Sequence, residues 1–182
     1  MKQVLFIHSA GPQGEGQGST GLLQYLEREL GSAFQVIAPN MPDPEDPQYS
    51  AWKEKLTEEL VHLEDGAVLV GHSIGGSALL KFLSEEELGK SFEKVITIAA
   101  PFWGIDAEWE LESFTLPEDF VSRASLLPDA VLFHSIGDEI VPFKHLEKYM
   151  ENLPGATVRQ LPGNDHAFQD GLPEAAEEIR GS

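Results

Sequence analysis

The sequence contains no cysteine. Disulfide bonds and thiolate metal sites are therefore excluded, which is compatible with a cytosolic protein. No apolar run approaches the roughly 20 residues that a membrane-spanning helix needs. The apolar stretch at the N-terminus is too short for a signal peptide. We therefore expect a cytoplasmic protein that does not bind membranes.

Basic residues are also scarce. Twelve Lys and Arg stand against 31 Asp and Glu, which gives a formal net charge of −19 at pH 7. Binding to nucleic acid or to anionic lipid relies on clusters of Lys and Arg, and the sequence has none. This balance excludes nucleic acid as a partner and favours a small neutral or cationic substrate over a polyanion.

The chain does contain a regular alternation of strand-like and helix-like segments. Apolar runs predict strands at 3–8, 33–38, 67–71, 94–100 and 130–137, with a weaker edge strand at 156–161. Apolar residues at helical spacing predict helices within 22–30, 52–63, 74–82, 142–152 and 166–180. Strand followed by helix, repeated, predicts an α/β fold. We expect residues 1–182 to form one domain, a three-layer α/β/α sandwich around a mainly parallel sheet of about six strands.

The first predicted helix has signals at both ends. Ser19 or Thr20 is suited to cap its start, and Gly31 is suited to end it.

The interval between the fourth and fifth predicted strands is unusually long and aromatic. It contains Phe102, Trp103, Trp109, Phe114 and Phe120. A loop of this length in a compact domain is uncommon unless it is functional. Two interpretations stay open: the rings attach the segment to the core, or residues 101–127 form a small cap over a pocket.

A glycine-rich turn follows the third predicted strand. Residues 71–75, Gly-His-Ser-Ile-Gly, match the G-x-S-x-G pattern at a junction between strand and helix. A sharp turn brings neighbouring backbone close, so the flanking positions need glycine. The turn also raises the hydroxyl of Ser73 beside the free N–H groups of a helix N-terminus. We favour a nucleophilic Ser73 over a serine that is incidental to a tight turn.

A nucleophilic serine needs a base, and the chain offers six histidines. His166, in "PGNDHAF", follows the last predicted strand, where a parallel sheet presents its binding face. It is the favoured base, with His8 as the second candidate. His72 adjoins Ser73 and is expected to point away from it.

Asp138, in "HSIGDEIVP", is the candidate acid that orients the histidine. An N-cap of the following helix is the alternative interpretation, and Glu139 is the neighbour that competes for the role. The order Ser73, Asp138, His166 is the order found in α/β-hydrolases. It predicts a triad at the carboxyl edge of the sheet.

Two backbone N–H groups are expected to hold the oxyanion. Ile74, directly after the serine, is one donor. The other comes from the first loop, "HSAGPQG", where Ala10 is favoured over Ser9 and Gly11. The competing interpretation is that "GPQGEGQG" cradles a phosphate, but it lacks the Lys-Ser/Thr ending of a P-loop.

On these motifs the sequence resembles the α/β-hydrolases, and within them the small serine hydrolases grouped with YdeN and the retinoblastoma-binding hydrolase. "FIHSAG", "PNMPDP", "YSAWKEKL", "VGHSIGG", "GDEIVP" and "NDHAF" occur in that family's order. The resemblance implies a reduced hydrolase sheet with Ser73, Asp138 and His166 as the triad.

Two features depart from the family pattern. The L-x-C-x-E motif associated with the retinoblastoma-binding relative cannot occur without cysteine, so that partner is not carried over. Asp165 precedes His166, where glycine is common, and could perturb the base or cap the last helix.

The resulting hypothesis is a serine hydrolase that cleaves a small carboxylic ester, with a thioester or amide as further options. No metal and no organic cofactor is called for. The expected pocket residues are His8, Ser9, Met41, Phe102, Trp103 and Trp109. Two alternatives stay open: a non-catalytic binding or scaffold protein, and an acyltransferase or perhydrolase that uses the same triad.

Overall fold

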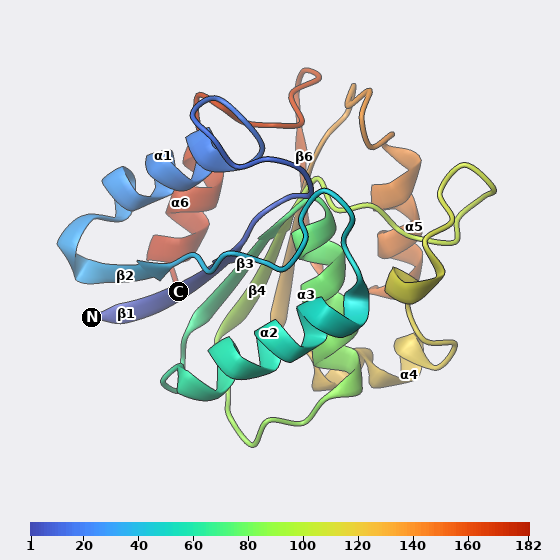
Figure 1. Cartoon of the computed structure of the whole chain (residues 1–182), viewed down its shortest axis with the longest axis horizontal. Helices are drawn as coiled ribbons and strands as arrows, with labels where there is room; N and C mark the ends of the chain where they lie inside the picture. Colours follow the sequence, from blue (N-terminus) through green and yellow to red (C-terminus); the bar gives the residue numbers. More distant parts are fainter.

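Six parallel strands form a single sheet in the order β2-β1-β3-β4-β5-β6 in the computed structural model, which describes residues 1–182 (Figure 1). The strands are β1 (Lys2–Ile7), β2 (Phe34–Ile37), β3 (Val68–His72), β4 (Lys94–Ile98), β5 (Asp129–Ser135) and β6 (Thr157–Leu161). The helices are α1 (Thr20–Leu30), α2 (Tyr49–His62), α3 (Ile74–Glu85), α4 (Phe120–Arg123), α5 (Lys144–Asn152) and α6 (Pro173–Arg180). The predicted α/β class is confirmed.

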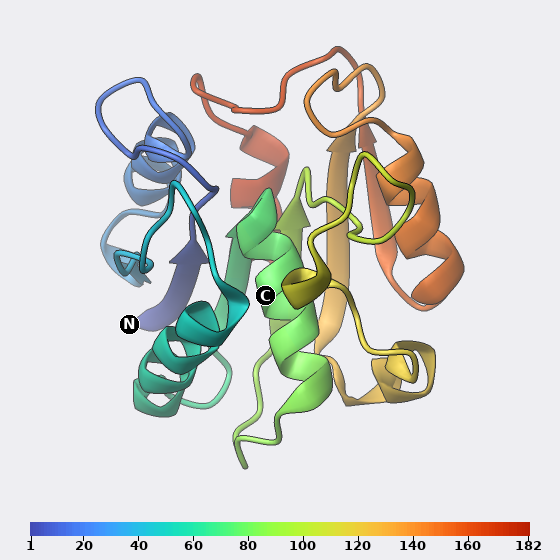
Figure 2. The same ribbon diagram turned by 45° about the vertical axis from the view of Figure 1, so that its right-hand side comes forward.

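Helices cover both faces of the sheet because successive strand residues point to opposite sides. In β1, Val4 and Phe6 belong to one buried apolar cluster, whereas Leu5 and Ile7 belong to the other. The first cluster is completed by α1 and α6, and the second by α2, α3 and α5. Figures 1 and 2 show these layers on either side of the strands. The three-layer prediction is confirmed. None of the helices has the length and apolar character required to cross a membrane.

The strand order reverses direction between β1 and β3. The chain first moves outward from β1 to β2 and then returns to place β3 on the other side of β1. Loops that leave two such strands diverge, and the crevice between them is the usual ligand site of an open α/β sheet. Ile7 pairs with Gly71 in the register of β1 and β3. The first loop and the turn at Ser73 therefore begin side by side.

The helix predicted over residues 166–180 is wrong at its start, because α6 begins at Pro173. Proline suits the first turn of a helix, where its missing N–H leaves no bond unmade. Upstream, Gly163 and Gly171 have φ values of +91° and +97°, and Phe168 has a φ of +49°. These left-handed residues interrupt any helix before Pro173. His166 therefore lies in a loop.

The cap predicted for the first helix is also wrong for Ser19. This residue occupies the N-cap position of α1 but makes no side-chain capping bond. Its hydroxyl instead lies 2.7 Å from Nδ1 of His72. Gly31, with a φ of +59°, ends α1 as predicted.

The long segment between β4 and β5 is attached to the core by its aromatic rings. Phe114 and Phe120 are buried. The Phe114 ring packs edge-on against Tyr49 and Trp52, with centroids 5.4 and 5.8 Å apart. These two rings therefore attach the segment to the core, which is one of the two interpretations. That residues 101–127 also form a cap over a pocket stays a prediction.

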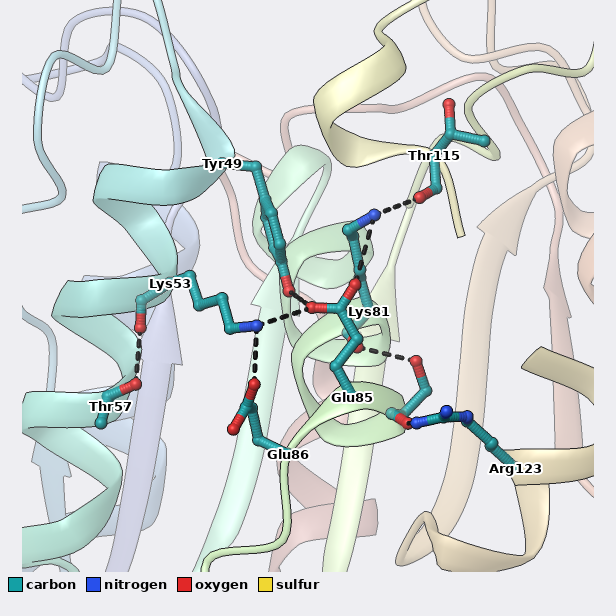
Figure 3. A network of polar contacts seen from close by, with 9 residues as sticks. Tyr49, Lys53, Thr57, Lys81, Glu85, Glu86, Thr115 and Arg123 are labelled. Carbon is teal, nitrogen blue, oxygen red and sulfur yellow. Dashed lines mark hydrogen bonds and ion pairs between the residues drawn. The ribbon is translucent and has the colours of Figure 1, made fainter. Parts of the chain in front are cut away.

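A polar network also joins this segment to α2 and α3 (Figure 3). Glu85 on α3 accepts hydrogen bonds from the Tyr49 hydroxyl at 2.8 Å and from Lys53 at 3.1 Å. Burial by itself raises the pKa of the Glu85 carboxyl, but these bonds together with nearby lysine charges hold it below its usual range. Lys81, one turn earlier, donates to the backbone oxygen of Thr115. The network attaches the middle of the segment, at Thr115, to α3, which Glu85 in turn joins to α2.

Candidate active site

The turn between β3 and α3 is as sharp as the sequence predicts. Ser73 has φ and ψ of 53° and −125°, a conformation that non-glycine residues rarely adopt. A Cβ on Gly71 would lie 2.5 Å from the Gly76 nitrogen, and one on Gly75 would lie 2.3 Å from the Ile7 oxygen. Glycine is therefore required on both sides of Ser73, because neighbouring backbone atoms lie too close to positions 71 and 75 for any side chain to fit there.

Gly75→Ala should therefore destabilise the protein severely. The new methyl group would meet the main-chain oxygen of β1, which cannot rotate away, so we expect a loss of at least about 3 kcal/mol in unfolding free energy. Urea denaturation measures this. Gly155→Ala is the matched control, because a Cβ there meets nothing within 4 Å. Equal stability of the two variants would contradict the close packing at the turn.

Ser73 presents its side chain at the start of α3. Its own N–H donates to the Ile98 oxygen at 2.8 Å, which attaches the turn to β4. Ile74 is the first residue of α3, so its N–H belongs to the donors that a helix leaves unbonded. The half-buried side chain of Ser73 thus stands beside a free backbone donor.

The turns that follow β5 and β6 are bonded to each other. The Gly137 N–H donates to the Gly163 oxygen at 2.8 Å. This contact brings His166 to Asp138, and Nδ1 of the histidine lies 2.8 Å from Oδ2 of the carboxylate. Because a carboxylate only accepts, Nδ1 carries the proton and Nε2 is free to receive one. The structure therefore joins two of the three predicted triad residues directly.

The Asp138 carboxylate is held by its second oxygen as well. Oδ1 accepts the N–H groups of Ile140 at 2.8 Å and Val141 at 2.9 Å. Burial by itself raises the pKa of Asp138, but these bonds and the one from His166 hold it below its usual range. Since α5 begins only at Lys144, Asp138 is not its N-cap. The exposed Glu139 makes no contact of this kind.

His166 also lies against the residue that precedes Ser73. Its backbone oxygen is 2.7 Å from Nε2 of His72, and the two rings have centroids 5.4 Å apart. The His166 side chain is 14% exposed, so its free nitrogen is not sealed in the core. A hydrogen bond from Ser73 to His166 is not formed here, and such bonds often tighten only with substrate. Asp165 accepts the Phe168 N–H at 2.9 Å and so caps this loop, not the last helix.

The first loop leaves one backbone donor unbonded among the three that the sequence proposes. The Ser9 N–H donates to Oγ of Ser19 at 2.7 Å, and the Gly11 N–H donates to the Pro44 oxygen at 2.6 Å. The exposed Ala10 has no such partner for its N–H.

Three predicted pocket residues are buried at the start of this loop or bonded to it. His8, Ser9 and Met41 are all buried. Nδ1 of His8 donates to the Ser9 oxygen at 2.8 Å, and its Nε2 accepts the Met41 N–H at 3.3 Å. Both ring nitrogens are thus occupied, and burial lowers the pKa of His8. His8 is therefore unsuited to act as the base.

The other three predicted pocket residues gather around His145 at the start of α5. The Phe102 N–H donates to Nδ1 of His145 at 2.9 Å, and the Trp109 ring packs edge-on against the same imidazole with centroids 4.3 Å apart. Trp103 packs against Trp109 at 5.5 Å. Trp103 Nε1 and His145 Nε2 are buried without a hydrogen-bond partner. These residues form an aromatic cluster with His145.

Sequence reasoning missed the roles of His72 and Ser19. His72 is 1% exposed, and its ring connects the first loop with the His166 loop. Its two partners lie 53 and 94 residues away along the chain. No local pattern carries that information, so only the folded arrangement could reveal it.

Comparison with known proteins identifies the family. The family model described as "Serine hydrolase" matches residues 16–172. The putative hydrolase YdeN of Bacillus subtilis is 25% identical over 173 residues, which cover 93% of this chain and 87% of YdeN. The serine hydrolase RBBP9 of Rattus norvegicus is 26% identical over 122 residues, covering 66% of this chain and 63% of RBBP9.

Solved structures show the same fold. The crystal structure of the ydeN gene product from B. subtilis superposes with a TM-score of 0.85 at 23% identity, covering 100% of this chain and 98% of the other. The 2-hydroxy-6-oxo-6-phenylhexa-2,4-dienoate hydrolase from Rhodococcus sp. strain RHA1 gives a TM-score of 0.73 at 17% identity, with 98% and 89% covered. The chain adopts the α/β-hydrolase fold and belongs to the serine hydrolase family.

Proposed function

We propose that the protein hydrolyses small carboxylic esters through a triad of Ser73, His166 and Asp138. The observation that carries the proposal is the 2.8 Å bond between His166 and Asp138, beside a strained serine at a helix N-terminus. Serine at ordinary pKa is a weak nucleophile and needs such a base. The free Nε2 of His166 supplies one.

In the proposed reaction, Ser73 Oγ attacks the ester carbonyl while His166 Nε2 takes the hydroxyl proton. The carbonyl oxygen becomes an oxyanion, which accepts hydrogen bonds from the N–H groups of Ile74 and Ala10. The intermediate collapses, the C–O bond breaks, and the alcohol leaves with the proton from His166. Asp138 keeps the imidazole oriented and stabilises its charged form.

Water completes the cycle. It attacks the acyl-enzyme as His166 takes its proton, and the second tetrahedral intermediate releases the acid as His166 returns that proton to Ser73 Oγ. We expect the aromatic cluster of Phe102, Trp103 and Trp109 to contact the acyl group. The formal charge of −19 disfavours anionic substrates by long-range repulsion. Neutral esters with a short apolar acyl group fit both features.

A panel of p-nitrophenyl esters of increasing acyl length tests this function. We expect turnover with an optimum among short chains, preceded by a burst of nitrophenol that matches the enzyme concentration. Adding a competing nucleophile such as hydroxylamine separates hydrolysis from acyl transfer. Folded protein that releases no nitrophenol from any ester would contradict the proposal.

A further inference from the structure

The imidazole of His72 is held between two loops. Nδ1 lies 2.7 Å from the Ser19 hydroxyl at the end of the first loop, and Nε2 lies 2.7 Å from the backbone oxygen of His166. The side chain is buried, with 1% of the residue exposed. His72 is also the direct neighbour of Ser73, so one side chain beside the candidate nucleophile contacts both loops.

The partners fix the tautomer of this ring. The His166 carbonyl only accepts, so Nε2 of His72 must carry a proton. Burial, followed by the nearby charge of His166, lowers the pKa of His72 to about 4. His72 is therefore neutral at pH 7, and its Nδ1 accepts the proton of the Ser19 hydroxyl. The other titratable groups that act on it are Asp138 and His8.

Ser19 passes the connection to the first loop. The Ser19 hydroxyl donates its proton to His72, and its oxygen still has lone pairs with which to accept. It accepts the Ser9 N–H at 2.7 Å. Ser9 Oγ lies 3.1 Å away and can donate to the same oxygen. The bond fixes the backbone directly before Ala10. The buried Ser19 is thus a link and not a helix cap.

We propose that His72 is a positioning residue that couples the loop bearing the candidate base to the loop bearing the candidate oxyanion donor. The proposal rests on the function proposed above. A neutral imidazole has one donor and one acceptor nitrogen on a rigid ring, and these satisfy both contacts. By holding the two loops at fixed positions relative to Ser73, it keeps His166 and Ala10 aligned for the same substrate carbonyl.

Three substitutions separate the two contacts. In His72→Gln the amide nitrogen reaches the place of Nε2 and keeps the bond to His166. In His72→Asn the shorter amide keeps only the bond to Ser19, and His72→Phe keeps neither. We expect kcat to fall about 10- to 100-fold in the Phe variant. KM should change less than about threefold, because the loops position reacting groups and do not hold the bulk of the substrate.

Recovery of kcat in the Gln and Asn variants distinguishes a positioning role of His72 from a purely structural one. We expect kcat of the Gln and Asn variants to lie between those of the wild type and the Phe variant. Ser19→Ala combined with His72→Phe should cost less than the sum of the two single losses, since both substitutions break the same chain of bonds. His62→Gln, an exposed histidine on α2, is the control. The proposal is overturned if His72→Phe keeps wild-type kcat per folded molecule, or if Gln and Asn restore nothing.

A measurement independent of turnover tests the arrangement itself. Nitrogen-15 NMR of labelled histidines should show His72 as the Nε2–H tautomer, uncharged from pH 8 down to pH 5.5. A ring protonated at Nδ1, or one that titrates near pH 6.5, would overturn the proposal. Turnover that survives Ser73→Ala refutes the proposed hydrolase mechanism instead, and the NMR result then still decides whether His72 joins the loops.

Discussion

Ser73→Ala should lower kcat for p-nitrophenyl esters by about 10⁶-fold, by analogy with the loss of the nucleophile in other serine triads. The methyl group of alanine cannot attack the carbonyl, and no second hydroxyl occupies the turn. The strained backbone stays acceptable, since alanine keeps the same Cβ as serine. The measurement is steady-state hydrolysis, together with labelling by a fluorophosphonate probe, which should modify the wild type and not the variant.

Ser77→Ala is the matched control for that loss. Ser77 lies one turn further along α3, and its buried hydroxyl donates to the Pro101 oxygen at 2.6 Å. Its removal should affect stability more than turnover, and labelling should persist. Ester turnover or probe labelling that is unchanged in Ser73→Ala would show that another residue performs the chemistry.

Asp138→Asn should lower kcat by about 10⁴-fold, the size seen when the acid of a serine triad is replaced by its amide. An amide keeps one oxygen for the N–H groups of Ile140 and Val141. Its nitrogen, however, would face Nδ1 of His166 and force the proton onto Nε2. The histidine then has no free nitrogen to accept the serine proton. Steady-state kinetics at saturating ester measures the loss.

Glu139→Gln is the control for this substitution, because it makes the same chemical change one residue along the chain. The Glu139 side chain is exposed, so its loss should leave kcat within about twofold. Thermal unfolding of both variants checks that the fold survives. Equal losses of kcat in the two variants, or a larger loss in Glu139→Gln, would show that Asp138 is not the acid of the triad.

The sequence was sufficient to predict the sheet because each strand has a local signal. Apolar runs and their spacing placed the ends of all six strands within two residues. The glycines around Ser73 predicted the sharp turn, since close backbone approach at Gly71 and Gly75 leaves no alternative residue. The last helix was misplaced because its apolar spacing continues upstream of Pro173, where left-handed residues in fact interrupt it.

The connections within the site could not be predicted from the sequence. Ser19 satisfies every local rule for a helix cap, yet its hydroxyl bonds to His72. His72 was expected to point away from the serine, and nothing nearby along the chain indicates its partners. Ala10 is singled out as the unbonded donor only because the N–H groups of Ser9 and Gly11 bond to residues that are distant along the chain. Such contacts arise from how loops meet, which periodicity does not encode.

The crystal structure of the enzyme after reaction with a fluorophosphonate tests the central claim most directly. The account predicts a bond from phosphorus to Ser73 Oγ, a phosphonyl oxygen within hydrogen-bond distance of the Ile74 and Ala10 N–H groups, and Nε2 of His166 facing the adduct. An adduct on a different residue, or an intact adduct at Ser73 with the imidazole of His166 directed away from it, would contradict the account.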